Sequence, residues 1–470
     1  MLLSKVFESF VRESPVTVMF RGMLENAWAT EEVDLMFLRT AHKQYLRKIL
    51  FSDLVDLMSL VVTCTKRSVG AAYQTLKKRI RAHVSDVYRK LNGIEPQVSA
   101  ELVRHLANRL QATVEETGGA LPARFPDYRM LILDGNHLAK TQHRLKELRT
   151  TRSGPLPGQA LAVLDPRLKL IVDVFPCENG HAQERSLLGA VLERVQPRDL
   201  YIDDRNFCTS GFLFGLADRG AFFITRQHAS TLRWEPVEGE EERYMGKNAT
   251  GEVWEGPIRL TDPESGKQMI VRRVRVKLYR PTRNGDKEVV VLTNLPHIQD
   301  SLIVADAYLD RWTIENAFGE LALAFNAEID TLAYPPAALF AFCVALMCYN
   351  LLSVVKAALR AVHGADKVQN EVSTYYLTDE ISSVWRGMMI AIPEPNWAEA
   401  FAGLKPKPLA ELLVGLAKQV DLPRFQKHPR GPKKPAPKRT SGKRQKHVAT
   451  AKILAQRKEN KAQKAKPPPC

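Results

Sequence analysis

The stretch that decides the fold of this chain is LILDGNH, at residues 131–137. An apolar run over residues 128–133 is followed directly by Asp134 and Gly135, a pattern typical of a β-strand that ends in a turn. The carboxylate of Asp134 is therefore expected at the edge of a β-sheet. The segments on either side of this strand indicate what kind of sheet it is.

Downstream of this strand, apolar segments of strand length and of helix length follow one another. Two more strands come first, and the turn-forming sequence Asp-Pro-Arg joins them. Helices and strands then alternate. The expected strands are residues 160–164, 168–175, 200–202 and 221–225, and the expected helices are residues 182–195 and 209–217. This order predicts an α/β fold, a mixed sheet with flanking helices.

Residues 228–300 are β-rich and are expected to interrupt the α/β domain as an insertion. Apolar and basic residues alternate near residue 275, which predicts a strand with one apolar and one basic face. Asn284-Gly285 is a strong hairpin signal. The basic face carries Arg273, Arg275 and Lys277 and is a plausible phosphate-binding surface. Trp254 is a candidate for stacking on a base displaced from the duplex, and a packing role is the alternative.

Two acidic positions are expected to meet at one edge of the sheet. Asp134 closes the first strand, and the Asp203-Asp204 pair closes the fourth. Neighbouring parallel strands lie about 4.8 Å apart, so these carboxylates would have the spacing that a pair of divalent cations needs. Turn chemistry at Asp134 and strand-end capping at Asp203 or Asp204 are the alternatives.

The third acid is expected on a helix over residues 302–325. Tyr308, Arg311 and Glu315 fall at positions i, i+3 and i+7, which places them on one face of that helix. Glu315 would complete a metal site while Arg311 binds a DNA phosphate. A surface ion pair of little energetic weight between Arg311 and Glu315 is the alternative.

With these residues in view, the chain resembles the bacterial insertion-sequence transposases that have an RNase H-like catalytic core and a β-strand insertion before the final glutamate. The resemblance covers about residues 10–360. Its strongest part is the Tyr-x-x-Arg-x-x-x-Glu signature within YLDRWTIENAF, at Tyr308, Arg311 and Glu315. Further matches are Asp134 at the end of its strand, Asp-Arg-x-Phe at Asp204, Arg205 and Phe207, and the FITR segment that ends at Arg226.

The resemblance implies DNA cleavage and strand transfer in which Asp134, Asp204 and Glu315 hold Mg²⁺, with Mn²⁺ as an alternative. The Asp-Arg-x-Phe match selects Asp204, and Asp203 is the second choice. The implied partners are double-stranded DNA, as terminal inverted repeats and as target, and a second copy of the chain on that DNA. No membrane and no small-molecule cofactor are implied. The expected location is the bacterial cytoplasm, at the nucleoid.

Two positions depart from the family pattern. Ala322 stands seven residues past Glu315, where the family usually has a lysine. Asn136 and His137 follow Gly135, where the family more often has a Gly-Thr type of sequence. Neither departure removes a metal ligand. A nuclease that hydrolyses without joining, and a DNA-binding protein that has lost catalysis, are the competing functions.

Residues 1–125 read as helical, and the resemblance implies that they recognise the ends of the element. Ser68 is a candidate cap of a helix that continues through a basic run. That run carries Lys77, Lys78, Arg79 and Arg81, which are candidate DNA contacts. A solvated helix face is the alternative for such a run. The expected division of the chain is residues 1–125, 126–227, 228–300, 301–423 and 424–470.

The last of these segments holds almost all of the excess charge. The chain carries 68 basic and 52 acidic residues, and residues 424–470 account for 16 of the bases and one acid, Glu459. This segment is predicted to be a disordered basic tail, with a fraying helix near residues 451–465 as an alternative. It is expected to bind the DNA backbone without sequence preference. A solubilising or RNA-binding extension is the alternative.

Two further observations limit the class of protein. The six cysteines form no C-x-x-C pair, which argues against a zinc site or a disulfide framework. The N-terminal segment has charges inside what would be the apolar core of a secretory signal, so no signal is expected. Residues 337–355 lack a formal charge and are long enough to span a membrane, but Asn350 and Ser353 favour a buried helix.

Overall fold

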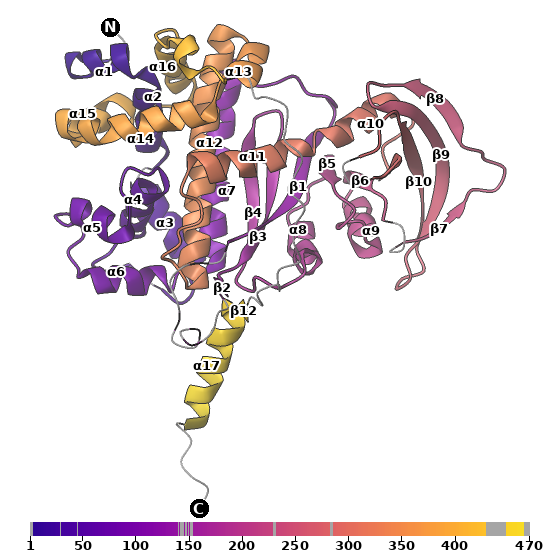
Figure 1. Cartoon of the computed structure of the whole chain (residues 1–470), viewed down its shortest axis with the longest axis horizontal. Helices are drawn as coiled ribbons and strands as arrows, with labels where there is room; N and C mark the ends of the chain where they lie inside the picture. The colour runs from indigo at the N-terminus through magenta and orange to yellow at the C-terminus, as the bar shows by residue number, and fades with distance from the viewer. Residues whose placement is uncertain are drawn as a thin grey trace, which may run out of the picture.

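The structure is a computed structural model of the chain, and it describes residues 3–28, 30–44, 46–139, 141, 145, 148, 150, 154–228, 232–282, 285–428 and 448–464. Asn284 of the expected hairpin and most of the basic residues of the tail lie outside the described residues. Figure 1 shows a mixed sheet between helices, with strands that extend away from the helical part.

The centre of the molecule is a mixed sheet whose five core strands run in the order β4-β3-β1-β5-β6. β1 pairs antiparallel with β3 and parallel with β5, and β5 pairs parallel with β6. The bounds are β1 Arg129–His137, β3 Gln159–Asp165, β4 Leu170–Cys177, β5 Asp199–Asp203 and β6 Phe222–Arg226. The predicted mixed α/β fold is therefore confirmed, and each of these strands overlaps a strand expected from the sequence.

The strands of the expected insertion continue the same sheet. β11 pairs antiparallel with β6, so that Val291 lies opposite Arg226, and β10, β9 and β7 follow in order, with β8 paired to β9. Their bounds are β7 Arg233–Pro236, β8 Arg243–Lys247, β9 Gly251–Thr261, β10 Gln268–Leu278 and β11 Glu288–Thr293. The insertion thus extends the core sheet as an unbroken set of hydrogen-bonded strands.

Alternate residues of the central strands point to opposite faces of the sheet and join different apolar clusters. Leu133 and Tyr201 face α8 (Leu188–Leu192) and α9 (Ser210–Asp218), whose apolar residues share their cluster. Ile132 and Ile202 face the larger core, which contains apolar residues of α11 (Trp312–Ala324) and α12 (Pro335–His363). A residue near the end of a central strand therefore packs against different helices, depending on which face of the sheet its side chain occupies.

The N-terminal helices pack on later helices within this larger core. Residues of α2, α4 and α7 are buried together with residues of α12, α14 and α16. The bounds are α1 Glu8–Glu13, α2 Pro15–Ala27, α3 Thr30–Thr40, α4 Phe51–Val62, α5 Val69–Leu76, α6 Val84–Leu91, α7 Pro96–Glu116, α13 Ala365–Glu371, α14 Thr374–Ala391, α15 Glu394–Phe401 and α16 Pro406–Ala417. One continuous core thus joins both ends of the helical part of the chain.

α12 is the one described helix that is long and apolar enough to cross a membrane, and its apolar window is entirely buried inside the protein. It packs against α7, α4, α16 and β4. The Asn350 side chain donates a 2.8 Å hydrogen bond to the carbonyl of Ile171 and accepts one of 2.8 Å from its N–H. Asn350, a polar residue within the apolar run, therefore provides hydrogen-bond partners for the Ile171 backbone on β4, the edge strand of the sheet.

Two helices expected from the sequence differ in the structure: one ends earlier than predicted, and the other is divided into two helices. Ser68 caps α5 by accepting a hydrogen bond of 3.2 Å from the Ala71 N–H, as expected, but α5 ends at Leu76 and the basic run forms a turn. The single helix expected over residues 302–325 is two helices, α10 (Ser301–Leu309) and α11. The break falls at Asp310 and Arg311, where the backbone makes short turn-type hydrogen bonds.

The C-terminal segment differs from the predicted disordered tail where it is described. A short strand β12 (Val448–Ala449) pairs in parallel with β2 (Pro155–Leu156), and helix α17 (Thr450–Lys464) follows it. α17 lies close to the alternative helix over residues 451–465. Figure 1 shows α17 leaving the body of the molecule beside β2.

Candidate active site

Asp134 lies within β1, and its carboxylate is largely buried, with 18% of the side chain exposed. Burial, as the main cause, and the nearby carboxylates of Asp204 and Glu315 raise the pKa of Asp134 to about 6. Two groups lower the pKa of Asp134: the Gly135 N–H, which donates a hydrogen bond of 2.9 Å to the Asp134 carboxylate, and the Arg311 guanidinium. Three acids far apart in the sequence therefore influence one another here.

Strand alternation distinguishes Asp204 from Asp203. β1 and β5 are paired with Ile132 opposite Ile202, and Asp134 and Asp204 each lie two residues beyond that pair, Asp134 still within β1 and Asp204 just after the end of β5. Both then point to the face that α11 covers. Asp204 accepts a hydrogen bond of 2.7 Å from the Asn206 N–H, which fixes its carboxylate just past the strand.

Asp203 points to the other face, together with Tyr201. Its side chain is fully buried, and the Thr225 side chain on the neighbouring strand β6 is the main group that partly offsets the effect of burial on its pKa. Burial is the main reason why the pKa of Asp203 is raised well above its ordinary value. The geometry therefore supports the choice of Asp204 as the partner of Asp134.

Glu315 lies in the first turn of α11, and Arg311 joins it to Asp134. Arg311 Nη1 is 2.7 Å from Glu315 Oε1 and 3.3 Å from Asp134 Oδ2. The guanidinium also stacks over the Trp312 ring, 5.0 Å from its centroid. Tyr308 is buried nearby, and burial raises the pKa of its hydroxyl. The signature residues thus gather at the break between two helices, where one continuous helix was expected.

The donor set fits a hard divalent cation, because it consists of carboxylate oxygens, and the charges of Asp204 and Glu315 help to raise the pKa of Asp134. In the described part of the chain, however, no three acidic, histidine or cysteine side chains lie around one point as they would around a bound ion. Arg311 bridges Asp134 and Glu315 in this arrangement. Its positive charge therefore stands between the carboxylates that would hold a metal.

Sequence reasoning missed a set of residues that position the acids. The Glu184 carboxylate accepts a hydrogen bond from the Asn206 side chain, and Arg185 donates one of 2.6 Å to the Asn206 carbonyl. A Cβ atom on Gly135 would lie 2.0 Å from the other oxygen of Glu184. A side chain at position 135 would therefore displace the Glu184 carboxylate, which links the strand of Asp134 to the loop of Asp204.

A cavity of about 380 Å³ lies beside this contact, lined by His137, Ala182, Gln183, Glu184, Arg185 and Asn206. His137 belongs to the Asn-His sequence in which the chain departs from the family pattern. No sequence signal pointed to Glu184 or Asn206, because the contact depends on how the segment after β4 folds back over the strand ends.

Among the predicted DNA contacts, two arginines lie near the acids. Arg226 ends β6 and forms an ion pair of 2.7 Å with Asp286. Arg226 and Asp204 both influence the pKa of Tyr308, and Arg205 that of Asp286. Both arginines therefore belong to the electrostatic surroundings of the acid cluster.

Other predicted contacts lie on the opposite face of the sheet. Arg273 and Arg275 pair with Glu242 and stack over Trp234 and Trp254, respectively. Val274 and Val276 alternate with these arginines along β10, and they belong to the larger core, on the face of the sheet that carries Asp134. The structure therefore does not bring Arg273, Arg275 and Trp254 to the acids. Lys277, next in the alternation, is exposed.

The basic run after α5 is divided in its roles. Arg79 forms ion pairs with Asp53, at 2.7 Å, and with Asp56, so its guanidinium is already engaged by α4. Lys77, Lys78 and Arg81 are exposed. Arg79 therefore stabilises the packing of two helices, and only the other three present their charges outward.

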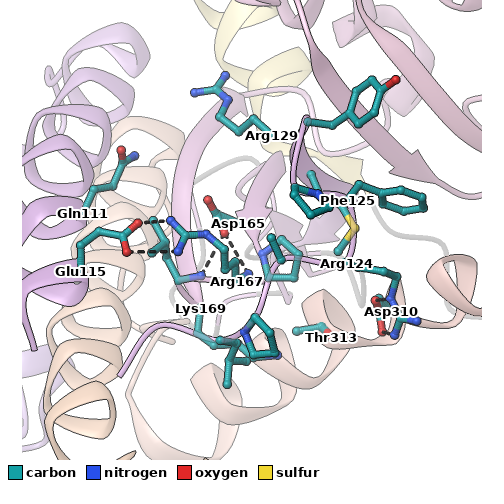
Figure 2. Close-up of a pocket in the computed structure, with 18 of the residues that line it drawn as sticks. Gln111, Glu115, Arg124, Phe125, Arg129, Asp165, Arg167, Lys169, Asp310 and Thr313 are labelled. Atoms are coloured by element: carbon teal, nitrogen blue, oxygen red, sulfur yellow. Dashed lines mark hydrogen bonds and ion pairs between the residues drawn. The ribbon is translucent and has the colours of Figure 1, made fainter. Parts of the chain in front are cut away.

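A cavity of about 1420 Å³ lies at the ends of β1 and β5 that are opposite to Asp134 and Asp204. It is lined by the first residues of β1 and β5 and by the turn after β3. Figure 2 shows two of its arginines paired with acids, Arg167 with Glu115 and Arg124 with Asp310. Because these charges are satisfied within the protein, the acid cluster remains the candidate active site.

The order of the core strands, with Asp134 within β1, Asp204 just after β5 and Glu315 on α11, is that of an RNase H-like α/β core. A family model described as "Transposase DDE domain" matches residues 126–351 of the chain. No curated protein is significantly similar in sequence. Among solved structures, the chain is similar to a piggyBac transposase in a synaptic complex with hairpin DNA, determined by cryo-EM. The identity is 11% and the TM-score 0.35, over 82% of this chain and 83% of that chain.

Proposed function

We propose that this protein is the transposase of an insertion sequence, which cleaves DNA at the ends of the element and joins those ends to target DNA. One observation carries the proposal: the charge of Asp204 acts on the carboxyl of Asp134, and Arg311 joins Asp134 to Glu315. These three acids come from distant parts of a matched transposase domain.

In this proposal Asp134, Asp204 and Glu315 hold Mg²⁺, or Mn²⁺. Bound divalent ions would activate the attacking oxygen and stabilise the leaving oxygen of a phosphodiester. Arg311 leaves the two carboxylates and binds a phosphate of the DNA, for which its planar guanidinium is suited. Arg226 and Tyr308 flank that phosphate from β6 and α10. Glu184 and Asn206 keep Asp204 in place throughout.

The proposed reaction has two steps. Water attacks a phosphodiester at the element end, the bond to the 3′ oxygen breaks, and a 3′-hydroxyl and a 5′-phosphate are released. The 3′-hydroxyl oxygen then attacks a second phosphodiester, and the 3′ oxygen of that strand leaves. Because two element ends have to be processed together, we expect a homodimer on DNA. We also propose a bacterial host, in which the protein would act in the cytoplasm, at the nucleoid.

A strand-transfer assay tests the proposal directly. The DNA that flanks the coding region supplies the inverted repeats for the substrate, and Mg²⁺ is added to start the reaction. Asp134→Asn, Asp204→Asn and Glu315→Gln are each expected to lower the cleavage rate by roughly a hundredfold or more, because several kcal/mol of charge stabilisation are lost. A hairpin-ended product would show that the hydroxyl first attacks the opposite strand.

Asp203→Asn is the matched control, because it removes an adjacent carboxylate that points to the other face. It is expected to retain cleavage within about tenfold, since a neutral side chain suits this buried site. Cut products without joined products would identify a nuclease. A shifted band without cutting would identify a DNA-binding protein that has lost catalysis.

A further inference from the structure

The C-terminal segment returns to the body of the protein at a defined place. Val448 and Ala449 pair in parallel with Pro155 and Leu156, and Ala449 is buried. Ile453, one turn into α17, is buried against Leu145, Leu148 and Ala333, with Tyr334 and Leu454 packed against the same cluster. We name this combination of a strand pair and an apolar cluster the root, and residues 448–464 the arm.

The root lies on the two segments that carry the chain away from the proposed catalytic acids. Its residues Leu145, Leu148 and the β2 strand belong to the connection that follows β1, the strand of Asp134. Ala333 follows α11, the helix of Glu315. The Ala139 N–H donates a hydrogen bond of 2.9 Å to the Glu328 carboxylate, which ties the two segments together. The arm is therefore attached at the edge of the sheet where β1 ends.

Beyond its first turn, the arm makes little contact with the body. Lys452, Lys458 and Lys461 are exposed, and Glu459 is the only acid of α17. Figure 1 shows the helix projecting from the molecule below the sheet. A polar helix of 15 residues is marginal in water by itself, so the root is what fixes its start and direction.

From this geometry we propose that the arm is a rooted DNA clamp, in which α17 lays its lysines along the backbone of the duplex that passes the catalytic edge. The clamp rests on the proposed function, because it presumes that DNA occupies that edge. It goes beyond a flexible basic tail, since the root sets the position of the charges before DNA arrives. Pre-organisation of this kind raises affinity without adding contacts.

The charges are tested by the salt dependence of binding to a blunt DNA duplex of arbitrary sequence. The variant Lys452→Gln/Lys458→Gln/Lys461→Gln is expected to reduce the slope of log K against log salt by about 3, close to one unit for each phosphate that a lysine no longer neutralises. The matched control removes three exposed lysines at the far end of the molecule, Lys405→Gln/Lys407→Gln/Lys418→Gln, and is expected to change the slope by less than about 1.

The root is tested by Ile453→Asp, which keeps every basic residue but places a charge in the apolar cluster. The expected result is a several-fold weaker affinity at fixed salt with the slope unchanged, because the lysines still reach the DNA backbone while the pre-organisation of the arm is removed. Hydrogen exchange measured without DNA is expected to show protected α17 amides in the parent and unprotected ones in Ile453→Asp.

Equal slopes for the arm variant and its control would overturn the clamp, and so would unprotected α17 amides in the parent. An unchanged affinity in Ile453→Asp would reduce the arm to a flexible tail and so also contradict the proposal. These results leave the proposed function standing if the parent still cuts and joins element ends. Loss of DNA binding by the parent itself would instead count against the proposed function.

Discussion

At the residue scale, Asp134 shows how the site depends on pH. Its pKa is raised from 3.8 to about 6, chiefly by burial. Between these values the folded protein binds more protons than the unfolded chain, so this residue lowers stability as the pH rises through that window. Below the window both states are protonated, and above it the destabilisation has reached its full size.

Asp134→Asn is therefore expected to raise the free energy of unfolding by about 2 kcal/mol at pH 8, and the gain should shrink as the pH is lowered towards 4. Urea titrations of both proteins across this range, with a chelator present, measure the effect. A difference between the proteins that does not vary with pH would contradict it.

Gly135 provides a second prediction at this scale. A methyl group here collides with the Glu184 carboxylate, which is held by Asn206. Gly135→Ala is expected to cost about 1 kcal/mol of stability and to slow DNA cleavage about tenfold or more, because Glu184 must release Asn206. Adding Glu184→Ala is expected to restore much of this stability.

Gly189→Ala is the control for this substitution, since a Cβ atom there meets nothing within 4 Å and the residue lies in helix α8. It is expected to leave cleavage unchanged and to add up to about 1 kcal/mol of stability. If Gly135→Ala behaves like this control, the contact with Glu184 has no role in placing the acids.

The sequence predicts Asp134, Asp204 and Glu315 as the catalytic acids because each lies in a local pattern of strand end, motif or helix spacing, and this choice stays a prediction. It could not reveal Glu184, which has no local signal and reaches Gly135 only through the folded segment after β4. It also could not show that Arg273 and Arg275 are engaged by Glu242, a residue more than thirty positions away.

At the element scale, α12 and β4 depend on one side chain. Asn350 satisfies both backbone groups of Ile171 on the edge strand. Asn350→Leu is expected to destabilise the protein by about 2–4 kcal/mol, since a buried N–H and a buried carbonyl lose their partners. Chemical denaturation measures this change. Ser353→Ala, one turn further along α12, is the control and is expected to cost less than about 1.5 kcal/mol.

The sequence predicted whether a segment is a helix or a strand where its apolar pattern was regular. It predicted the first and last residues of these elements less well. The strands of the core overlap the expected ranges because each is a short apolar run bounded by turn residues. The break between α10 and α11 was not foreseen, because residues 308–315 keep a helical spacing even across a turn. The continuity of the insertion with the core sheet depends on pairing between β6 and β11, which periodicity cannot show.

At the scale of the whole molecule, the helical ends of the chain share one core. The expected boundary at residue 125 remains a prediction, but α2, α4 and α7 bury the same apolar surface as α12 and α14. Removal of residues 1–125 is therefore expected to yield an aggregated chain, because α12 would be exposed to water.

Size-exclusion chromatography of the truncated chain checks this prediction, with a chain that lacks residues 448–470 as the control. The control removes only the arm and the last six residues of the chain, so it should elute as a folded protein. A monodisperse, cooperatively unfolding fragment 126–470 would show instead that the first helices form a dispensable unit.

The pairing of β6 with β11 also bears on how such a protein can change over time. The chain leaves the core at Arg226 and re-enters on the adjacent strand, where Gln227 already bonds to Val290. The segment between these points, which contains strands β7 to β10, leaves and re-enters the core through two adjacent strands. Segments of any length could be exchanged there without rethreading the core, so this junction is a natural place for relatives to gain or lose modules, and for engineers to graft them.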